Sequence, residues 1–147
     1  AILTEDPAFT GICDNMAASL MALGKIDKAI VGSDRIAVNG DFANKVGTYG
    51  LAIHCQFHKI PFLVAAPYTT IDFDCESGAS IPIEQRSKEE VRGVKGHFGQ
   101  IQWAPNTGEV YNPAFDVTPA ELVSYWVLDK AALSLEEIQQ GVLRNIY

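Results

Sequence analysis

The stretch KAIVGSDRIAVNGDFANKVGTYGLAIHCQFHKIPFLVAA, residues 28–66, holds two short apolar runs with a helical pattern between them. The runs at residues 28–32 and 61–66 are predicted to be strands, and Pro67 closes the second one. Between them, the apolar residues of 44–57 recur at the spacing of one helix face. Apolar strands joined through a helix are typical of a βαβ unit, in which the strands are parallel.

The same alternation continues on both sides of this stretch. Residues 9–13 and 125–128 are predicted strands, and residues 15–23 a predicted helix. The segment 118–121 has the residue order of a helix start, and a capping box at Ser134 opens a last helix that extends to about residue 145. The pattern predicts an α/β fold, doubly wound, with a mostly parallel Rossmann-like sheet and helices on both faces.

Residues 68–108 interrupt this pattern, because they are rich in Gly, Ser and charged side chains. Only two short strands are predicted there, at residues 81–83 and 100–103. We therefore expect a long excursion from the sheet.

Length and composition indicate an ordinary globular chain. The 147 residues predict one domain, and 48% of them are hydrophobic. The net charge of −7 argues against nucleic acid or membranes as partners, and no apolar run is long enough to cross a bilayer. Three cysteines and the lack of a signal peptide favour a cytoplasmic location, or a nuclear one in a eukaryote. The abrupt opening at Ala1 suggests a processed or excised segment.

Asp34 is the candidate catalytic residue, because it follows the strand at residues 28–32. Ligands of open α/β sheets bind at the carboxyl ends of strands. Its neighbours Ile30, Val31 and Ile36 are apolar, and partial desolvation would raise the pKa of the carboxyl toward the general-acid range. The alternative role, and the commoner one for such an aspartate, is an ion pair with Arg35 or a turn cap.

Asn44 and Lys45 are the candidate substrate-binding residues. They stand at the expected N-terminus of a helix, where free N–H groups and the helix dipole attract anions. A lysine is unfavourable there by roughly 0.3–1 kcal/mol unless an anion such as phosphate binds beside it. The alternative is a lysine that extends into water. Gly47 and Gly50 in the same helix indicate close packing, or a close approach by a backbone or a ligand.

Other signals are weaker. His54 and His58 share a helix face, but the sequence offers no third ligand, so we expect no metal. Cys13 is either a reactive thiol or, more commonly, a structural one. The chain has no GxGxxG motif, no P-loop and no Gly-x-Ser-x-Gly elbow, which disfavours a nucleotide cofactor and a serine hydrolase.

Four segments together resemble the methylthioribose-1-phosphate isomerases of methionine salvage. They are TGICDNMA at residues 10–17, the run from 30 to 52, IPFLVAAPYTTID at 60–72 and NPAFDVTP at 112–119. Their order and spacing match over nearly the whole chain. Ser33 stands where that family usually has Ala, a change that leaves Asp34 untouched.

The resemblance implies an aldose–ketose isomerase that converts 5-methylthioribose 1-phosphate to 5-methylthioribulose 1-phosphate. Asp34 matches the catalytic acid/base of that family, and Asn44 and Lys45 match residues that hold the sugar phosphate. The resemblance implies no metal and no organic cofactor. It also implies a homodimer.

One departure suggests that the site is incomplete. The family also uses a catalytic cysteine and phosphate-binding arginines from a preceding segment, and none of Cys13, Cys55 or Cys75 has a matching context. We therefore expect residues 1–147 to be a single Rossmann-like domain, the C-terminal part of a longer two-domain protein that completes the site.

Two alternatives remain within the wider family. One is a non-catalytic regulatory subunit of the initiation factor 2B type, although those subunits generally lack an aspartate that matches Asp34. The other is a ribose-1,5-bisphosphate isomerase. Its second phosphate would need basic groups such as Arg86, Lys88, Arg92 and Lys95, which more commonly form a solvated face.

Overall fold

Three short parallel strands form the centre of the molecule. The computed structural model describes residues 10–146. The first sheet has the order β1-β4-β9-β10, in which β1, β4 and β9 are parallel and β10 is antiparallel. Its strands are β1 (Ala29–Val31), β4 (Phe62–Ala65), β9 (Tyr125–Val127) and β10 (Ala132–Leu133). The predicted strands at residues 28–32, 61–66 and 125–128 are confirmed, each slightly shorter than expected.

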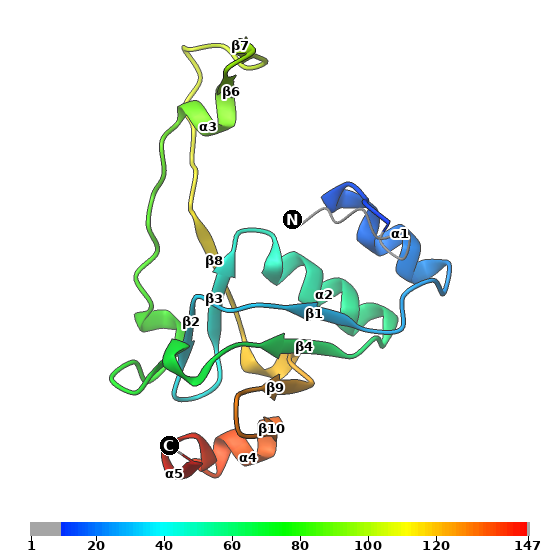
Figure 1. Cartoon of the computed structure of the whole chain (residues 1–147), viewed down its shortest axis with the longest axis vertical. Helices are drawn as coiled ribbons and strands as arrows, with labels where there is room; N and C mark the ends of the chain where they lie inside the picture. Colours follow the sequence, from blue (N-terminus) through cyan, green and yellow to red (C-terminus); the bar gives the residue numbers. More distant parts are fainter. Residues whose placement is uncertain (1–9, 147) are drawn as a thin grey trace.

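A second sheet stands beside the first and was not expected (Figure 1). Its order is β5-β2-β3-β8, with β2 parallel to β5 and antiparallel to β3. The strands are β2 (Arg35–Ala37), β3 (Phe42–Lys45), β5 (Ile71–Asp72) and β8 (Phe115–Thr118). The β2–β3 turn needs Gly40, which has φ 91°, and a Cβ there would lie 3.0 Å from the Trp126 ring.

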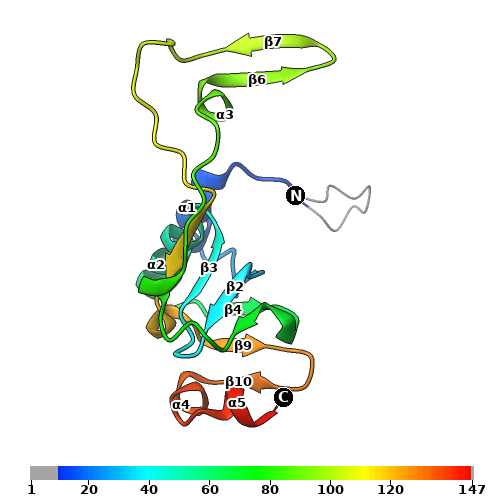
Figure 2. The same cartoon turned by 90° about the vertical axis from the view of Figure 1, so that its left-hand side faces the viewer.

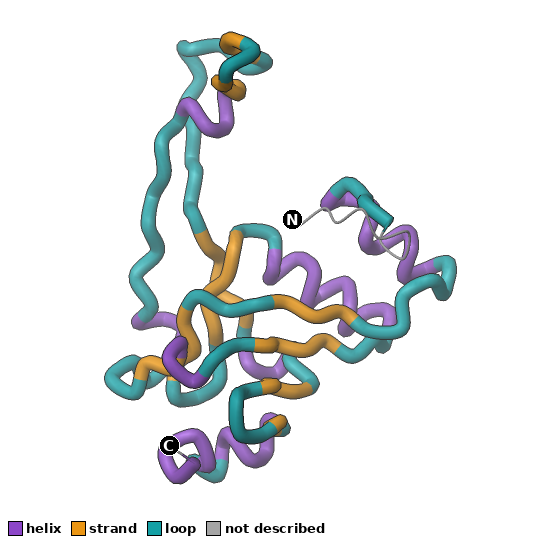
Figure 3. Tube along the Cα trace, viewed as in Figure 1, coloured by secondary structure: helices purple, strands orange, loops and turns teal. Residues whose placement is uncertain are grey.

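Short helices connect the strands, as the purple segments of Figure 3 show. The α-helices are α1 (Ala17–Ala22), α2 (Thr48–His58), α3 (Glu89–Arg92), α4 (Leu135–Gln139) and α5 (Val142–Ile146). The 3₁₀ turns are η1 (Asp14–Met16), η2 (Tyr68–Thr70), η3 (Gly78–Ser80) and η4 (Ala120–Leu122). The predicted helix at residues 15–23 is confirmed, with a 3₁₀ first turn.

One apolar core joins the two sheets to α2 and α4. Trp126 and Phe42 are fully buried, and the Phe42 and Phe62 rings lie 6.3 Å apart between centroids, which links β3 to β4. The Trp126 indole donates to the Gly40 carbonyl over 3.1 Å. The core therefore fixes the β2–β3 hairpin against the parallel strands.

Several predicted boundaries are wrong because tertiary pairing overrides the local pattern. The helix expected from residue 44 begins at Thr48, since Asn44 and Lys45 pair with β8 instead. The helix expected at 118–121 is only η4, because Thr118 ends β8. The last helix starts at its capping box but breaks at Gly141, where φ is 78°.

Two predicted strands are also not observed. Residue 9 lies outside the described residues, and residues 10–13 form no strand because no described strand pairs with them. Residues 81–83 are irregular, since Ile81 turns into a small core cluster. The strand expected at 100–103 is confirmed as β7 (Gly99–Gln102), which pairs with β6 (Gly93–Gly96).

Residues 84–112, hereafter the arm, project from the body of the molecule (Figures 1 and 2). The arm contains α3 and the β6–β7 hairpin. Backbone hydrogen bonds from Arg86 to Asn112, and from Ala114 to Glu84, hold its two legs together at the base. The expected excursion is therefore an ordered projection.

The fold is a mixed α/β fold with both parallel and antiparallel strands. In the first sheet, β4 and β9 are added on the same side of β1, and no described strand pairs with the other side of β1. The doubly wound arrangement, which needs strands on both sides, therefore stays a prediction. No helix in the part of the chain that the structure describes is long and apolar enough to span a membrane.

Candidate functional site

Asp34 lies in the loop between β1 and β2, at the carboxyl end of a parallel strand. Its backbone N–H donates to the Ala43 carbonyl over 2.9 Å, and the Ser33 hydroxyl donates to the same oxygen over 3.4 Å. These bonds fix the loop beside the peptide that precedes Asn44. The Asp34 side chain itself is exposed, so the expected desolvation by its apolar neighbours is not observed.

The Asp34 carboxylate is not paired with Arg35. The Arg35 guanidinium instead lies 2.8 Å from Asp72, on the parallel strand β5. Among residues 10–146 no hydrogen-bond donor or cation contacts the Asp34 carboxylate. The carboxylate oxygens are therefore available to contact a ligand.

A cavity of about 430 Å³ adjoins Asp34. Its polar lining comes from the β1–β2 loop and from the segment that follows β4, and comprises Asp34, Arg35, Thr69, Thr70, Asp72 and Asp74. Both segments follow carboxyl ends of parallel strands, which is where ligands of α/β sheets bind.

Asn44 and Lys45 end strand β3, opposite Asp116 and Phe115 of β8. The Asn44 amide donates to the Thr48 hydroxyl over 3.0 Å, and that hydroxyl donates to the Lys45 carbonyl over 2.8 Å. The Lys45 ammonium lies 5.1 Å from the centroid of the Phe115 ring, within the range of a cation–π contact.

An acidic side chain from β8 lies at the N-terminus of α2. The Asp116 carboxylate accepts the N–H of Gly47 over 2.7 Å and that of Tyr49 over 3.1 Å. The carboxylate thus satisfies two N–H groups at this helix start and lies at the positive end of the helix dipole, where negative charge is favoured. The N–H groups of Gly47 and Tyr49 are therefore already bonded, and binding of a sugar phosphate by Asn44 and Lys45 stays a prediction.

Lys45 lines a second cavity, of about 460 Å³, between α1, α2 and β1. Lys28 and Asp14 contribute its other charged groups, and the rest of the lining is mostly apolar. This cavity shares no lining residue with the one beside Asp34. The described residues thus place Asn44 beside Lys45, but they leave Asp34 and Lys45 on separate cavities.

Comparison with known proteins decides the family. The model of the initiation factor 2 subunit family matches residues 3–134, nearly the whole chain. The chain belongs to the initiation factor 2 subunit family. Within it, the chain is 62% identical over 130 residues to a methylthioribose-1-phosphate isomerase of Yersinia pestis, which covers 88% of this chain and 38% of that protein.

Solved structures agree with this assignment. The 5-methylthioribose 1-phosphate isomerase of Pyrococcus horikoshii is 43% identical with a TM-score of 0.82, over 92% of this chain and 37% of that one. The delta subunit of the translation initiation factor eIF-2B from A. fulgidus is 38% identical with a TM-score of 0.78, over 90% and 38%. The resemblance to methylthioribose-1-phosphate isomerases is confirmed, and the chain spans about 38% of the length of the curated relatives it matches.

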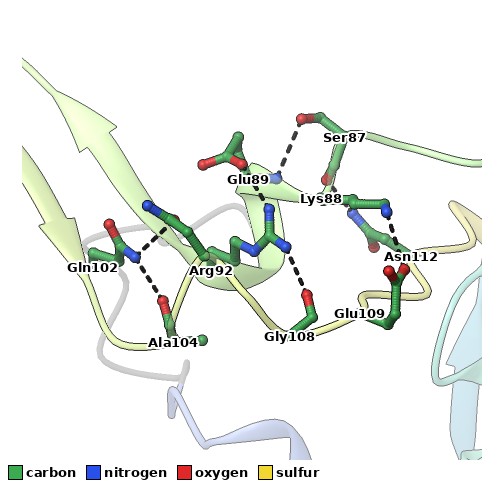
Figure 4. Close-up of polar contacts among 10 residues, drawn as sticks. Ser87, Lys88, Glu89, Arg92, Gln102, Ala104, Gly108, Glu109 and Asn112 are labelled. Carbon is green, nitrogen blue, oxygen red and sulfur yellow. Dashed lines mark hydrogen bonds and ion pairs between the residues drawn. The ribbon is translucent and has the colours of Figure 1, made fainter.

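In this member of the initiation factor 2 subunit family, most basic groups of the arm are paired with acidic ones. Figure 4 shows Arg92 bound to Glu89 at 3.1 Å and Lys88 bound to Glu109 at 3.2 Å. Arg86 binds Glu90, and this hydrogen bond holds the pKa of Glu90 below its ordinary value. These pairs leave little basic charge on the arm for a second phosphate.

The cysteines and histidines form no further site in this family member. No three His, Cys, Asp or Glu side chains within residues 10–146 are placed to share a metal ion. Cys13 is exposed, whereas Cys55 and Cys75 are buried, and burial raises the pKa of the Cys55 thiol. A Cβ at Gly47 or Gly50 would meet nothing within 4 Å, so the expected close packing is not observed among the described residues, and the approach of a ligand there stays a prediction.

Two carboxylates were not identified from the sequence. Asp116 fills the N-terminus of α2, and Asp41 accepts the backbone N–H groups of Gly78 and Ala120, both over 2.9 Å. Both residues bind backbone groups that are distant in sequence. Asp116 lies within NPAFDVTP, one of the four resembling segments, and this was the only signal that marked it.

Proposed function

We propose that the full-length protein isomerises 5-methylthioribose 1-phosphate to 5-methylthioribulose 1-phosphate. The observation that carries this proposal is the 62% identity over 130 residues to relatives named for that activity. The unpaired Asp34 carboxylate beside a cavity at the strand ends supports it.

The substrate determines what the site has to do. Phosphate on the anomeric carbon prevents the sugar ring from opening freely to an aldehyde. The ring oxygen must be protonated as its bond to C1 breaks, and one hydrogen must then move from C2 to C1. No net oxidation occurs, because C1 is reduced as C2 is oxidised.

Asp34 is proposed as the acid/base in this sequence. Its carboxylate adjoins the cavity and has no partner among the described residues, so its oxygens are available to a bound substrate. Asn44 supports the substrate through its carbonyl oxygen and the second N–H of its amide, since the first N–H donates to Thr48. Lys45 supplies positive charge for the phosphate.

The rest of the site is proposed to come from outside this sequence. A preceding segment of the longer protein would supply the catalytic cysteine and phosphate-binding arginines, and would close the gap between the Asp34 and Lys45 cavities. We propose that residues 1–147 are the C-terminal domain of that two-domain protein, in which the sheet is doubly wound and Rossmann-like. We further propose a cytoplasmic homodimer.

Phosphorus NMR of the substrate tests the activity directly. Full-length protein should convert 5-methylthioribose 1-phosphate, whereas full-length Asp34→Asn and the present chain alone should not. Residual turnover of Asp34→Asn within about tenfold of wild type, which is roughly 1.4 kcal/mol, would show that Asp34 is not the acid/base.

A regulatory subunit is the second candidate. The likeness to the A. fulgidus delta subunit, with a TM-score of 0.78 at 38% identity, favours it. Thermal unfolding separates the two. A sugar-phosphate site should stabilise the folded protein by about 2.7 kcal/mol at a hundredfold excess of ligand over Kd, whereas a regulatory scaffold should show no shift.

A further inference from the structure

The strand β8 carries two adjacent residues that contact the proposed substrate-binding segment from outside. Phe115 lies under the Lys45 ammonium, and Asp116 binds the backbone just beyond Lys45. Asp116 lies 69 residues after Gly47 and 67 residues after Tyr49, the two residues whose backbone N–H groups it binds.

Asp116 determines the path of the chain between Lys45 and α2. One carboxylate oxygen accepts the N–H of Gly47, where φ is 108°, and the other accepts that of Tyr49. Hydrogen bonds from backbone N–H groups to a carboxylate are shorter and stronger than those between neutral groups. The turn is therefore held by a charged group that belongs to another strand.

The buried residue Thr48 transmits this constraint to the site. Its hydroxyl donates to the Lys45 carbonyl and accepts from the Asn44 amide. One N–H of the Asn44 amide is used here, which leaves its second N–H and its carbonyl oxygen for substrate hydroxyls. A shift of the turn would move Thr48, and with it both Asn44 and Lys45.

We infer that Asp116 is a positioning residue for substrate binding, which acts through Thr48 on Asn44 and Lys45 and does not touch the substrate. The inference rests on the proposed isomerase function. The Asp116 carboxylate already holds the N–H groups of Gly47 and Tyr49, and its contribution to substrate binding is the placement of Asn44 and Lys45.

The test uses full-length protein and compares Asp116→Asn with Asp41→Asn. Asp41 is a matched control, because its carboxylate also accepts two distant backbone N–H groups but lies at the other end of β3 from Lys45. Asp116→Asn should raise KM for 5-methylthioribose 1-phosphate by roughly tenfold with kcat within about threefold, as expected for lost substrate binding. Asp41→Asn should lower the unfolding temperature without this change in KM.

Two further variants keep the inference testable if Asp116→Asn folds poorly. Thr48→Val leaves the Asp116 cap in place and should reproduce the rise in KM. In an Asn44→Ala, Lys45→Ala background, Asp116→Asn should add almost nothing to KM, because its effect passes through those two residues.

The outcomes separate this inference from the proposed function. If wild-type protein is active but Asp116→Asn and Asp41→Asn have equal KM values, the positioning role alone is overturned. It is also overturned if Asp116→Asn raises KM in the Asn44→Ala, Lys45→Ala background by the same factor as in wild type. Folded wild-type protein without turnover would overturn the proposed function and this inference together.

Discussion

Asp41 connects three segments of the body through a single carboxylate. Besides the N–H groups of Gly78 and Ala120, it accepts the amide of Asn39 within the β2–β3 turn. Such a residue stabilises the fold by more than one local contact, since each lost partner leaves a polar backbone group with no acceptor.

Asp41→Ala should therefore lower the free energy of unfolding of the full-length protein by about 1–3 kcal/mol. The exposed Asp74 provides the control, and Asp74→Ala should change this free energy by less than about 0.5 kcal/mol. Denaturant unfolding of both variants measures the difference. Equal stability of the two would contradict the role given to Asp41.

At the scale of elements, the two glycines near the start of α2 differ in backbone conformation and should respond oppositely to substitution by alanine. Gly47 has φ 108°, which is unfavourable for any residue with a Cβ, whereas Gly50 lies within the helix. A Cβ would fit at either position without a clash.

Gly47→Ala should therefore destabilise the protein by about 1 kcal/mol or more through backbone strain, and Gly50→Ala should stabilise it by about 0.4–1 kcal/mol. Neither added Cβ would meet a neighbour, so thermal unfolding of both variants compares the two backbone conformations without a steric clash. Stabilisation by Gly47→Ala would show that the turn has another conformation in solution.

The capping box at the start of α4 has a predictable pH dependence. The Glu137 carboxylate accepts the Ser134 backbone N–H over 2.8 Å and the Ser134 hydroxyl over 2.9 Å, which lowers the pKa of Glu137 below its ordinary value of 4.5. A depressed folded-state pKa contributes stability above pH 4.5, and this stability is lost as the pH falls through the folded-state pKa.

Ser134→Ala should lower the free energy of unfolding by about 1 kcal/mol at neutral pH. The difference between wild type and Glu137→Gln should be largest above pH 4.5 and should shrink in acid, because protonated glutamate no longer differs in charge from glutamine. Urea unfolding at pH 7 and pH 3.5 measures both effects. A constant difference for Glu137→Gln across this range would contradict the depressed pKa.

The sequence predicted elements well where their signals are local, and poorly where a distant partner decides. The apolar runs of β1, β4 and β9 and the capping box of α4 were identifiable, since each depends on neighbouring residues. Asn44 and Lys45 were placed in a helix because their pairing with β8 is encoded some 70 residues away. Asp116 was missed for the same reason, because the backbone groups that it binds are 67 and 69 residues away in sequence. Asp34, in contrast, was placed correctly at a strand end.

At the scale of the whole molecule, the arm and the body are held by separate interactions. Arg92 organises the arm, since its guanidinium binds Glu89 and the Gly108 carbonyl over 2.7 Å (Figure 4). Its contacts do not include the body core. Local opening of the arm should therefore be possible while the body stays folded.

Arg92→Ala should increase amide hydrogen exchange across residues 85–110 and leave β1, β4 and β9 as protected as in wild type. Lys95→Ala, on the exposed strand β6 of the same arm, is the control and should change neither region. Mass spectrometry of the exchanged peptides distinguishes the two parts. Faster exchange in the body of Arg92→Ala would show that arm and body unfold as one unit.

The bond from Asp116 to the start of α2 has a consequence for how the chain reaches its native state. The helix cap comes from a strand 67 to 69 residues downstream, so α2 gains it only after the intervening chain, arm included, has closed into a loop. The entropy of closing a flexible loop grows only with the logarithm of its length, by about 0.6 kcal/mol for each doubling. Lengthening or shortening the arm should therefore alter this closure only slightly, which leaves its length free to vary among related proteins without disturbing the turn between β3 and α2.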